Sequence, residues 1–208
     1  KVEMSLIPFS ELILNLNSDN IDIIADGMYV REDRAQQIYY GDIWYTQGGA
    51  LLAPENGTIN GQDDFDPSKT VVGYTPGTIW QTTVEGWAAD GKIKEARATG
   101  DQTESIVALQ NGKIDAFLTD SVVENLMKFQ PETLKGLKLC SNYKDTEAEI
   151  GRIAPSVKFG NEDFMKDINK VVAEMRDEGV LDQIYEKYGL DPKLHAITND
   201  QKDNGLNK

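Results

Sequence analysis

Apolar and polar positions follow two patterns along this chain, one typical of strands and one typical of helices, and the two patterns alternate. Short apolar runs bounded by Gly, Asn, Asp or Pro are typical of strands, whereas apolar residues three and four apart are typical of one helix face. The expected strands lie at residues 2–7, 21–25, 49–53, 69–74, 92–97, 114–119, 137–140 and 150–154. The expected helices lie at residues 9–16, 31–38, 79–89, 102–111, 121–130, 164–175 and 180–188. Strands that alternate with helices predict an α/β fold.

Sequence signals also predict where some helices begin and which face they bury. Asp101 stands three residues before Glu104, which is the spacing of a helix cap, and Gly112 follows the last apolar position of that helix. Ser121 and Glu124 have the same S-x-x-E spacing. In the next long helix, the residues at helical spacing form an expected core-facing stripe of Phe164, Ile168, Val171, Val172 and Met175.

Asp120 follows directly on the expected strand at 114–119. In α/β folds the carboxyl ends of the strands are where ligands bind. A carboxylate at such an edge can accept hydrogen bonds from an ammonium group. The residues alone favour this role and a simple turn or cap role about equally.

Composition narrows the classes of protein that this chain can represent. Its 208 residues are 39% hydrophobic and 27% charged, which is ordinary for one large domain or two small lobes. The formal net charge of −14 disfavours nucleic acid and an anionic membrane surface as partners. No apolar run approaches the length of a membrane span, so we expect no direct membrane insertion. The chain opens on the strand-like Lys1-Val2-Glu3-Met4, which suggests a mature or truncated product.

Nucleophilic and metal chemistry have little support in the sequence. Cys140 is the one cysteine, and its apolar neighbours favour inert burial. His195 is the one histidine and precedes the polar residues 196–208, where we expect a solvated, frayed end. We therefore expect no catalytic residues, no cofactor and no metal. The acids that are most readily assigned to solvated loops are Asp63, Asp64, Asp66, Glu147 and Glu149.

Several segments, taken in order, resemble the motifs of one protein family. They are Ile21–Met28 followed by Arg34-Ala35, Trp44–Leu52, Val71–Thr78, Ala108–Ala116 and Glu174–Tyr188. Over about residues 1–190 the chain resembles the extracellular solute-binding proteins of polar amino-acid ABC importers. The resemblance implies the type II periplasmic-binding-protein fold, an α/β fold of two lobes with a hinge and an interlobe ligand cleft.

The resemblance also implies how the chain is divided. Lobe one is expected at residues 1–52 plus 152–193, lobe two at 53–151, and a polar tail at 194–208. The crossing strands are expected near Leu51–Pro54 and Ile150–Pro155. Members of the family begin with a further strand and helix that this sequence does not contain. We therefore expect lobe one to expose the apolar residues Val2, Met4, Ile23 and Ile24.

The ligand-binding residues are carried over from the family position by position. Arg34 matches an arginine that pairs with the carboxylate of the ligand, a geometry that suits guanidinium, although an arginine here is otherwise a surface residue. Gly27 matches a close backbone approach, or is a turn glycine. Asp120 matches the acid that receives the ammonium group.

The remaining expected ligand-binding residues lie at a helix start and after Gly27. Thr75 precedes a turn, and the backbone amides of Thr78 and Ile79 at the helix start can hold a carboxylate; an ordinary strand-to-helix turn has the same sequence. Tyr29 stands where the family usually has Thr or Ser, so its ring would occupy pocket volume. Trp80 replaces a small polar residue and is either core or ligand-stacking.

The function implied by the resemblance is capture of a small-molecule amino acid for delivery to the permease of an ABC importer. The expected location is the periplasm, or the cell surface as a lipoprotein, after removal of a signal peptide. Two alternatives stay open. One is an enzyme resembling cyclohexadienyl dehydratase on the same fold, and the other is the ligand-binding ectodomain of a sensor.

Overall fold

The computed structural model of the protein describes residues 1–146 and 150–206, and it divides into two compact units. Unit 1 comprises Lys1–Gln47 and Gly151–Lys208, and unit 2 comprises Gly48–Ile150. Glu147 and Glu149 lie outside the described residues. Unit 2 begins at Gly48, before the strand at 49–54, because that whole strand pairs inside unit 2. The boundary expected after residue 52 would have divided this strand.

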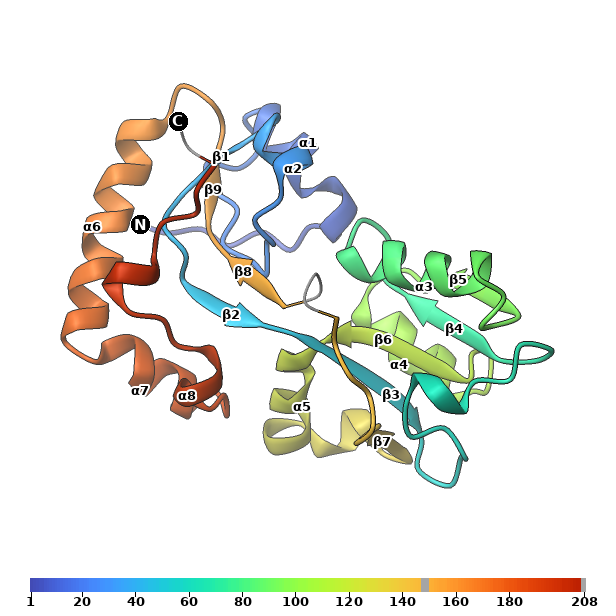
Figure 1. Ribbon diagram of the computed structural model, residues 1–208. Coiled ribbons are helices and arrows are strands. Elements are labelled where there is room, and N and C mark those ends of the chain that lie inside the picture. Colours follow the sequence, from blue (N-terminus) through green and yellow to red (C-terminus); the bar gives the residue numbers. More distant parts are fainter. Residues whose placement is uncertain (147–149, 207–208) are drawn as a thin grey trace. The chain divides into compact units, whose positions relative to one another are not determined.

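Unit 2 is built on a mixed five-stranded sheet with the strand order β5-β4-β6-β3-β7 (Figure 1). The strands are β3 (Gly49–Pro54), β4 (Val71–Tyr74), β5 (Glu95–Ala98), β6 (Ala116–Asp120) and β7 (Leu137–Leu139). β4 runs parallel to β5 and β6, while β3 runs antiparallel to β6 and β7. The continuous apolar runs in β3 and β6 arise because side chains on both faces of these strands are buried.

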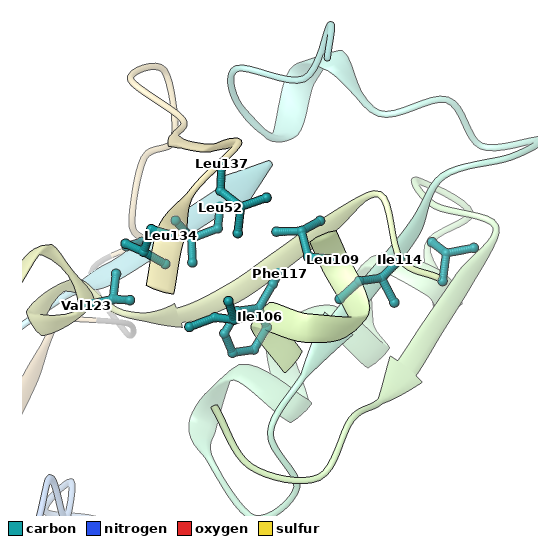
Figure 2. Close-up of a cluster of buried hydrophobic side chains, with 10 residues drawn as sticks. Leu52, Ile106, Leu109, Ile114, Phe117, Val123, Leu134 and Leu137 are labelled. Atoms are coloured by element: carbon teal, nitrogen blue, oxygen red, sulfur yellow. The ribbon is translucent and has the colours of Figure 1, made fainter. Parts of the chain in front are cut away.

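Helices follow the parallel strands of unit 2 and complete its core. They are α3 (Ile79–Ala89), α4 (Gln102–Gln110) and α5 (Glu124–Phe129), with short 3-10 turns η2 (Gln62–Asp64), η3 (Ser121–Val123) and η4 (Pro131–Leu134). Figure 2 shows Ile106 and Leu109 of α4 packed with Phe117 of β6. The core is closed by Ala50, Leu52, Val71, Ile114, Val123, Leu134 and Leu137.

Unit 1 contains two separate two-stranded sheets. β1 (Tyr39–Tyr40) pairs with β9 (Ser156–Val157), and β2 (Tyr45–Gln47) pairs with β8 (Gly151–Ile153), both antiparallel. The helical elements are η1 (Phe9–Glu11), α1 (Leu12–Asn17), α2 (Glu32–Ala35), α6 (Glu162–Asp177), α7 (Val180–Lys187), α8 (Pro192–His195) and η5 (Asn199–Gln201). The buried core consists of Leu12, Leu16, Ile24, Met28, Ile38, Tyr40, Ile43 and Ala154. No helix of the described residues is long and apolar enough to cross a membrane.

Two expected strands of unit 1 do not form. Residues 1–8 have no regular structure, and the segment 21–25 contributes a single bridge from Ile24 to Ser156. An apolar pattern makes a strand only where a neighbour pairs with it, and in the described part of the chain these segments lack such a ladder. Val2 and Met4 are exposed as expected, but the expectation for Ile24 is wrong because its side chain is in the core.

One of the two predicted helix caps is correct. The carboxylate of Asp101 accepts a hydrogen bond from the backbone N–H of Glu104 at 2.9 Å, which confirms the cap of α4. The capping box at Ser121 is wrong. The hydroxyl of Ser121 instead accepts a hydrogen bond from the backbone N–H of Gly48 at 3.2 Å, so it fastens the start of β3.

The expected stripe on α6 is correct in part. Val172 is buried as expected, whereas Phe164 and Val171 are 46% and 53% exposed, and the buried Met165 was not in the stripe. Apolar residues stand next to each other at 164–165 and at 171–172, so two adjacent rows of the helix are both apolar at helical spacing. The tertiary contacts of the helix decide which of the two rows faces the core.

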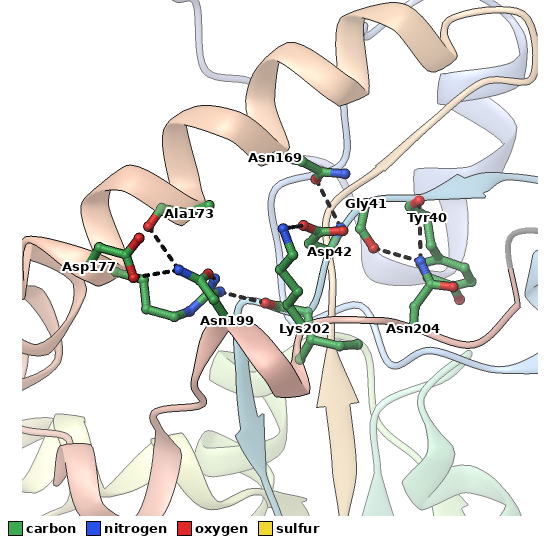
Figure 3. A network of polar contacts seen from close by, with 11 residues as sticks. Tyr40, Gly41, Asp42, Asn169, Ala173, Asp177, Asn199, Lys202 and Asn204 are labelled. Carbon is green, nitrogen blue, oxygen red and sulfur yellow. Dashed lines mark hydrogen bonds and ion pairs between the residues drawn. The ribbon is translucent and has the colours of Figure 1, made fainter.

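The polar C-terminal segment is packed against unit 1, so the expected frayed end is wrong for the described residues (Figure 3). The backbone N–H of Ile43 donates to the carbonyl of Lys202 at 2.7 Å, and the amide of Asn204 donates to the carbonyl of Gly41 at 2.8 Å. His195 is 7% exposed, and its Nδ1 lies 2.8 Å from the carbonyl oxygen of Thr46, so it is not solvated. The C-terminal segment is polar in composition, but hydrogen bonds with backbone groups of Gly41 and Ile43 hold it in place.

Candidate functional site

In unit 2, the expected ligand-binding residues gather at one edge of the sheet. β4 ends at Tyr74 and β6 ends at Asp120, and these strands are parallel neighbours. The carboxyl ends of parallel neighbours meet at the same edge. Thr75 follows β4 directly, and Thr78 and Ile79 begin α3 just beyond it.

The carboxylate of Asp120 is held by a neighbouring indole. Nε1 of Trp80, in the first turn of α3, donates to Oδ1 of Asp120 at 2.9 Å. The Trp80 side chain is 1% exposed, so its ring is part of the interior of unit 2. A Cβ placed on Gly49 would lie 2.8 Å from Cη2 of Trp80, so the ring requires glycine at that position. Of the two roles considered for Trp80, the structure supports the core role with a polar tip that orients Asp120.

The turn before α3 is closed by its own side chain. The hydroxyl of Thr78 donates to the carbonyl of Thr75 at 2.7 Å, and Gly77 adopts a positive φ of 81° that favours glycine. Thr78 is the N-cap residue in an extended conformation, and Ile79 is the first helical residue. The first N–H groups of a helix have no partners within that helix and carry a partial positive charge, so this end of α3 suits an anion.

Asp145 contacts the first residues of unit 2, Gly48 and Gly49. Its Oδ1 accepts a hydrogen bond from the backbone N–H of Gly49 at 2.8 Å. A Cβ on Gly48 or Gly49 would collide with the same carboxylate. Together with Ser121, which binds Gly48 through its hydroxyl, Asp145 anchors the first residues of β3. Gly49 is therefore a packing requirement of unit 2, because the buried Trp80 ring also stands where its Cβ would lie.

In unit 1, Arg34 is buried rather than solvated. Its side chain lies in α2, its Nη1 donates to the carbonyl of Tyr29 at 3.2 Å, and its Cζ stacks 5.4 Å from the centre of the Phe9 ring. Burial is the main cause that lowers the pKa of the Arg34 guanidinium below its ordinary value, and the nearby Tyr40 opposes it. A desolvated guanidinium attracts an anion more strongly than a hydrated one does.

Tyr29 is fixed from both its backbone and its ring. Its carbonyl accepts a second hydrogen bond from the hydroxyl of Tyr40 at 2.8 Å, and it bridges to Ile153 in antiparallel fashion. Burial raises the pKa of Tyr40 to about 12, and the nearby guanidinium of Arg34 opposes this shift. The ring of Tyr29 lies over Gly151, where any Cβ would overlap it. The ring thus fills space beside β8 within unit 1, and its expected place in the ligand pocket stays a prediction.

Gly27 faces polar groups of β2 that the sequence did not single out. A Cβ placed on Gly27 would lie 3.6 Å from Nε2 of Gln47 and 3.9 Å from the hydroxyl oxygen of Tyr45. Gln47 is 3% exposed. Gln47 lies in the family-like segment Trp44–Leu52, just before two glycines, but its burial becomes visible only in three dimensions.

The structure therefore holds the expected residues as two sets. Gly27, Tyr29 and Arg34 are brought together in unit 1, and Thr75, Thr78, Ile79 and Asp120 are brought together in unit 2. The described residues contain no group of three His, Cys, Asp or Glu side chains that could hold a metal ion. Cys140 is buried as expected, and desolvation raises the pKa of its thiol to about 11.

Comparison with known proteins identifies the family. Residues 1–191 match the bacterial extracellular solute-binding proteins, family 3. The chain belongs to this family. The expected type II periplasmic-binding-protein fold is confirmed, since an ancestral arginine-binding protein solved in complex with arginine superposes with a TM-score of 0.77. That structure is 27% identical, and the match covers 91% of this chain and 80% of the other.

Two curated relatives of this solute-binding protein show the range of its family. A probable histidine-binding protein of Neisseria gonorrhoeae is 27% identical over 189 residues, which are 90% of this chain and 68% of the relative. The L-cystine-binding protein TcyJ of Escherichia coli K12 is 29% identical over 199 residues, with coverage of 90% and 68%. The family is extracellular, and its members are solute-binding proteins rather than enzymes as a rule.

Proposed function

We propose that this solute-binding protein captures a free L-α-amino acid and delivers it to an ABC importer. The observation that carries the proposal is Asp120, a carboxylate held by the Trp80 indole at the carboxyl edge of a parallel sheet, next to the start of α3. Asp120 accepts hydrogen bonds from the ammonium group of the ligand. The buried guanidinium of Arg34 and the amide end of α3 offer positive charge to its carboxylate.

The ligands of the relatives support this class. The relatives are named for binding histidine, L-cystine or arginine. These ligands share the ammonium and carboxylate groups of a free amino acid and differ in their side chains. A site that pairs with both charged groups is therefore a common requirement, and Gly27, Tyr29, Thr75, Thr78 and Ile79 are the residues that we assign to shaping it.

Isothermal titration calorimetry with L-histidine, L-arginine and L-cystine tests the proposal. The wild-type protein is expected to bind at least one of them. Arg34→Met and Asp120→Asn each remove a charge-assisted contact worth about 1.5–3 kcal/mol, so the affinity falls by roughly tenfold or more. Arg31→Met is the matched control, because Arg31 pairs with Asp33 at the surface. Wild-type affinity in both site variants would refute the assignment of these residues.

We infer that the protein releases its ligand unchanged. Among the described residues, the Cys140 thiol is buried with a pKa of about 11, and His195 is bound to a backbone carbonyl. Neither offers an activated nucleophile at neutral pH. Mass spectrometry after incubation with amino acids and cyclohexadienyl acids is expected to return each compound intact. A new product that disappears in Asp120→Asn would establish an enzyme instead.

We also propose the setting in which capture takes place. The protein acts in the periplasm or, attached through a lipid, on the cell surface, and it docks on the permease of the importer. Membership of an extracellular family supports this location. Fractionation of the native cells, followed by copurification with membrane permease components, tests both the compartment and the partner.

A further inference from the structure

Gln47 carries a buried carboxamide that its surroundings do not satisfy. It is the last residue of β2, and its side chain is 3% exposed. Within residues 1–146 and 150–206, neither Nε2 nor Oε1 has a hydrogen-bond partner. A buried amide without partners costs free energy, and an apolar side chain of similar length would avoid that cost. Violations of this kind are expected mainly at functional sites.

The carboxamide points towards residues already assigned to ligand binding. Its Nε2 lies 3.6 Å from the position of a Cβ on Gly27, on the side that the glycine leaves open. Gln47 pairs in register with Gly151, and the ring of Tyr29 lies over Gly151. Gly27 is itself partly exposed. Gln47 therefore stands with Gly27 and Tyr29 in one corner of unit 1.

We propose that Gln47 is a ligand-binding residue whose carboxamide hydrogen-bonds a polar group on the amino-acid side chain. The proposal rests on the proposed function and deepens it. An amide offers two donors and an acceptor without a charge. It therefore fits a neutral group that both donates and accepts, such as a carboxamide or a neutral imidazole. An aliphatic side chain would leave the amide unsatisfied, so it is rejected.

A matched pair of variants separates this role from simple burial. Gln47→Met keeps the length of the side chain and removes its polar atoms. Ser156→Ala also removes a buried polar atom that lacks a partner, because Oγ of Ser156 is unpartnered and its residue is fully buried in β9. Ser156 belongs to neither set of site residues, so its variant controls for the removal of a buried polar group.

Calorimetry with L-glutamine, L-histidine and L-leucine is expected to show binding of the first two to the wild type and at least tenfold weaker binding to Gln47→Met. Ser156→Ala is expected to bind like the wild type. Thermal unfolding without ligand should show Gln47→Met at least as stable as the wild type, because no partner of the amide is lost. The side-chain amide signals of Gln47 in ¹H–¹⁵N spectra, assigned by their loss in the variant, should shift on addition of L-glutamine.

The outcomes are distinct. Unchanged affinity in Gln47→Met, or unmoved amide signals at saturation, overturns the role of Gln47 while amino-acid binding stands. Preference of the wild type for L-leucine overturns the selectivity. Failure of the wild type to bind any of the twenty amino acids overturns the proposed function together with this inference.

Discussion

The indole N–H of Trp80 donates a hydrogen bond to Oδ1 of Asp120 over 2.9 Å. The two residues come from different elements, the first turn of α3 and the last position of β6. The contact fixes the direction of a carboxylate at the sheet edge and satisfies the one polar atom of a buried ring. Orientation of a charged group before a ligand arrives reduces the entropy lost on binding.

Trp80→Phe removes this hydrogen bond while it keeps an aromatic ring. A hydrogen bond to a charged group contributes about 1.5–3 kcal/mol, so we expect lower stability in urea unfolding and weaker amino-acid binding by roughly threefold or more. Trp87→Phe is the control, because Trp87 packs on Phe65 with ring centres 5.2 Å apart. Equal affinities for wild type and Trp80→Phe would show that Asp120 needs no such support.

Two glycines of unit 2 are expected to respond in opposite directions to alanine. A Cβ on Gly49 would lie 2.8 Å from both Trp80 and Asp145, so Gly49→Ala should destabilise by about 1–3 kcal/mol. A Cβ on Gly86, inside α3, meets nothing within 4 Å, so Gly86→Ala should stabilise by about 0.5–1 kcal/mol. Chemical denaturation of both variants measures the difference. A stable Gly49→Ala protein would mean that the Trp80 ring can move aside.

Asn204 is expected to anchor the C-terminal segment. Its amide donates to the carbonyl of Gly41 at 2.8 Å, and its Oδ1 accepts from the backbone of Leu206 at 2.8 Å, in a buried position. Asn204→Ala should cost about 1–3 kcal/mol because it leaves buried backbone groups unpaired. Lys202→Ala breaks a more exposed ion pair with Asp42 and should cost under about 1 kcal/mol. Thermal unfolding compares the two, and a larger effect at Lys202 would contradict this ranking.

The Cys140 thiol is expected to resist modification until the protein unfolds. Desolvation raises its pKa from 9.0 to about 11, with Lys138 opposing the shift. Because the folded pKa is higher than the unfolded one, this thiol favours the folded state below pH 9, and that contribution is lost as the pH rises towards 11. Reaction with a thiol reagent at pH 8 should be slow in buffer and fast in urea. Fast reaction in buffer would show that the site opens locally.

Hydrogen exchange is expected to distinguish residues 1–8 from the sheet of unit 2. Residues 1–8 form no strand, and Val2 and Met4 are exposed, whereas β6 pairs on both sides with β3 and β4. Amides at 1–8 should exchange within the shortest labelling time, and those of β6 should be the slowest. Equal protection of the two segments would mean that residues 1–8 pair with another strand in solution.

The sequence by itself determined the class of the fold and most elements of unit 2. The runs at 50–53 and 116–118 are apolar throughout because both faces of β3 and β6 are buried, so the sequence alone predicts these strands. The Asp101 cap was equally predictable, since its partner lies three residues away. The order of the family motifs then supplied Arg34 and Asp120, whose roles as ligand residues stay predictions.

Only the tertiary structure decided which strand-like segments pair with a neighbouring strand and which polar side chains are buried. Residues 2–7 have the alternation of a strand, but hydrogen bonding between strands depends on a neighbour that local sequence does not encode. His195 looks like a tail residue until a carbonyl of β2 is brought to its ring. In the sequence, Gln47 is an ordinary polar residue before two glycines. Only the fold shows that its amide is buried without a partner and lies next to Gly27. Burial and pairing arise between distant segments, and for that reason these features could be found only in three dimensions.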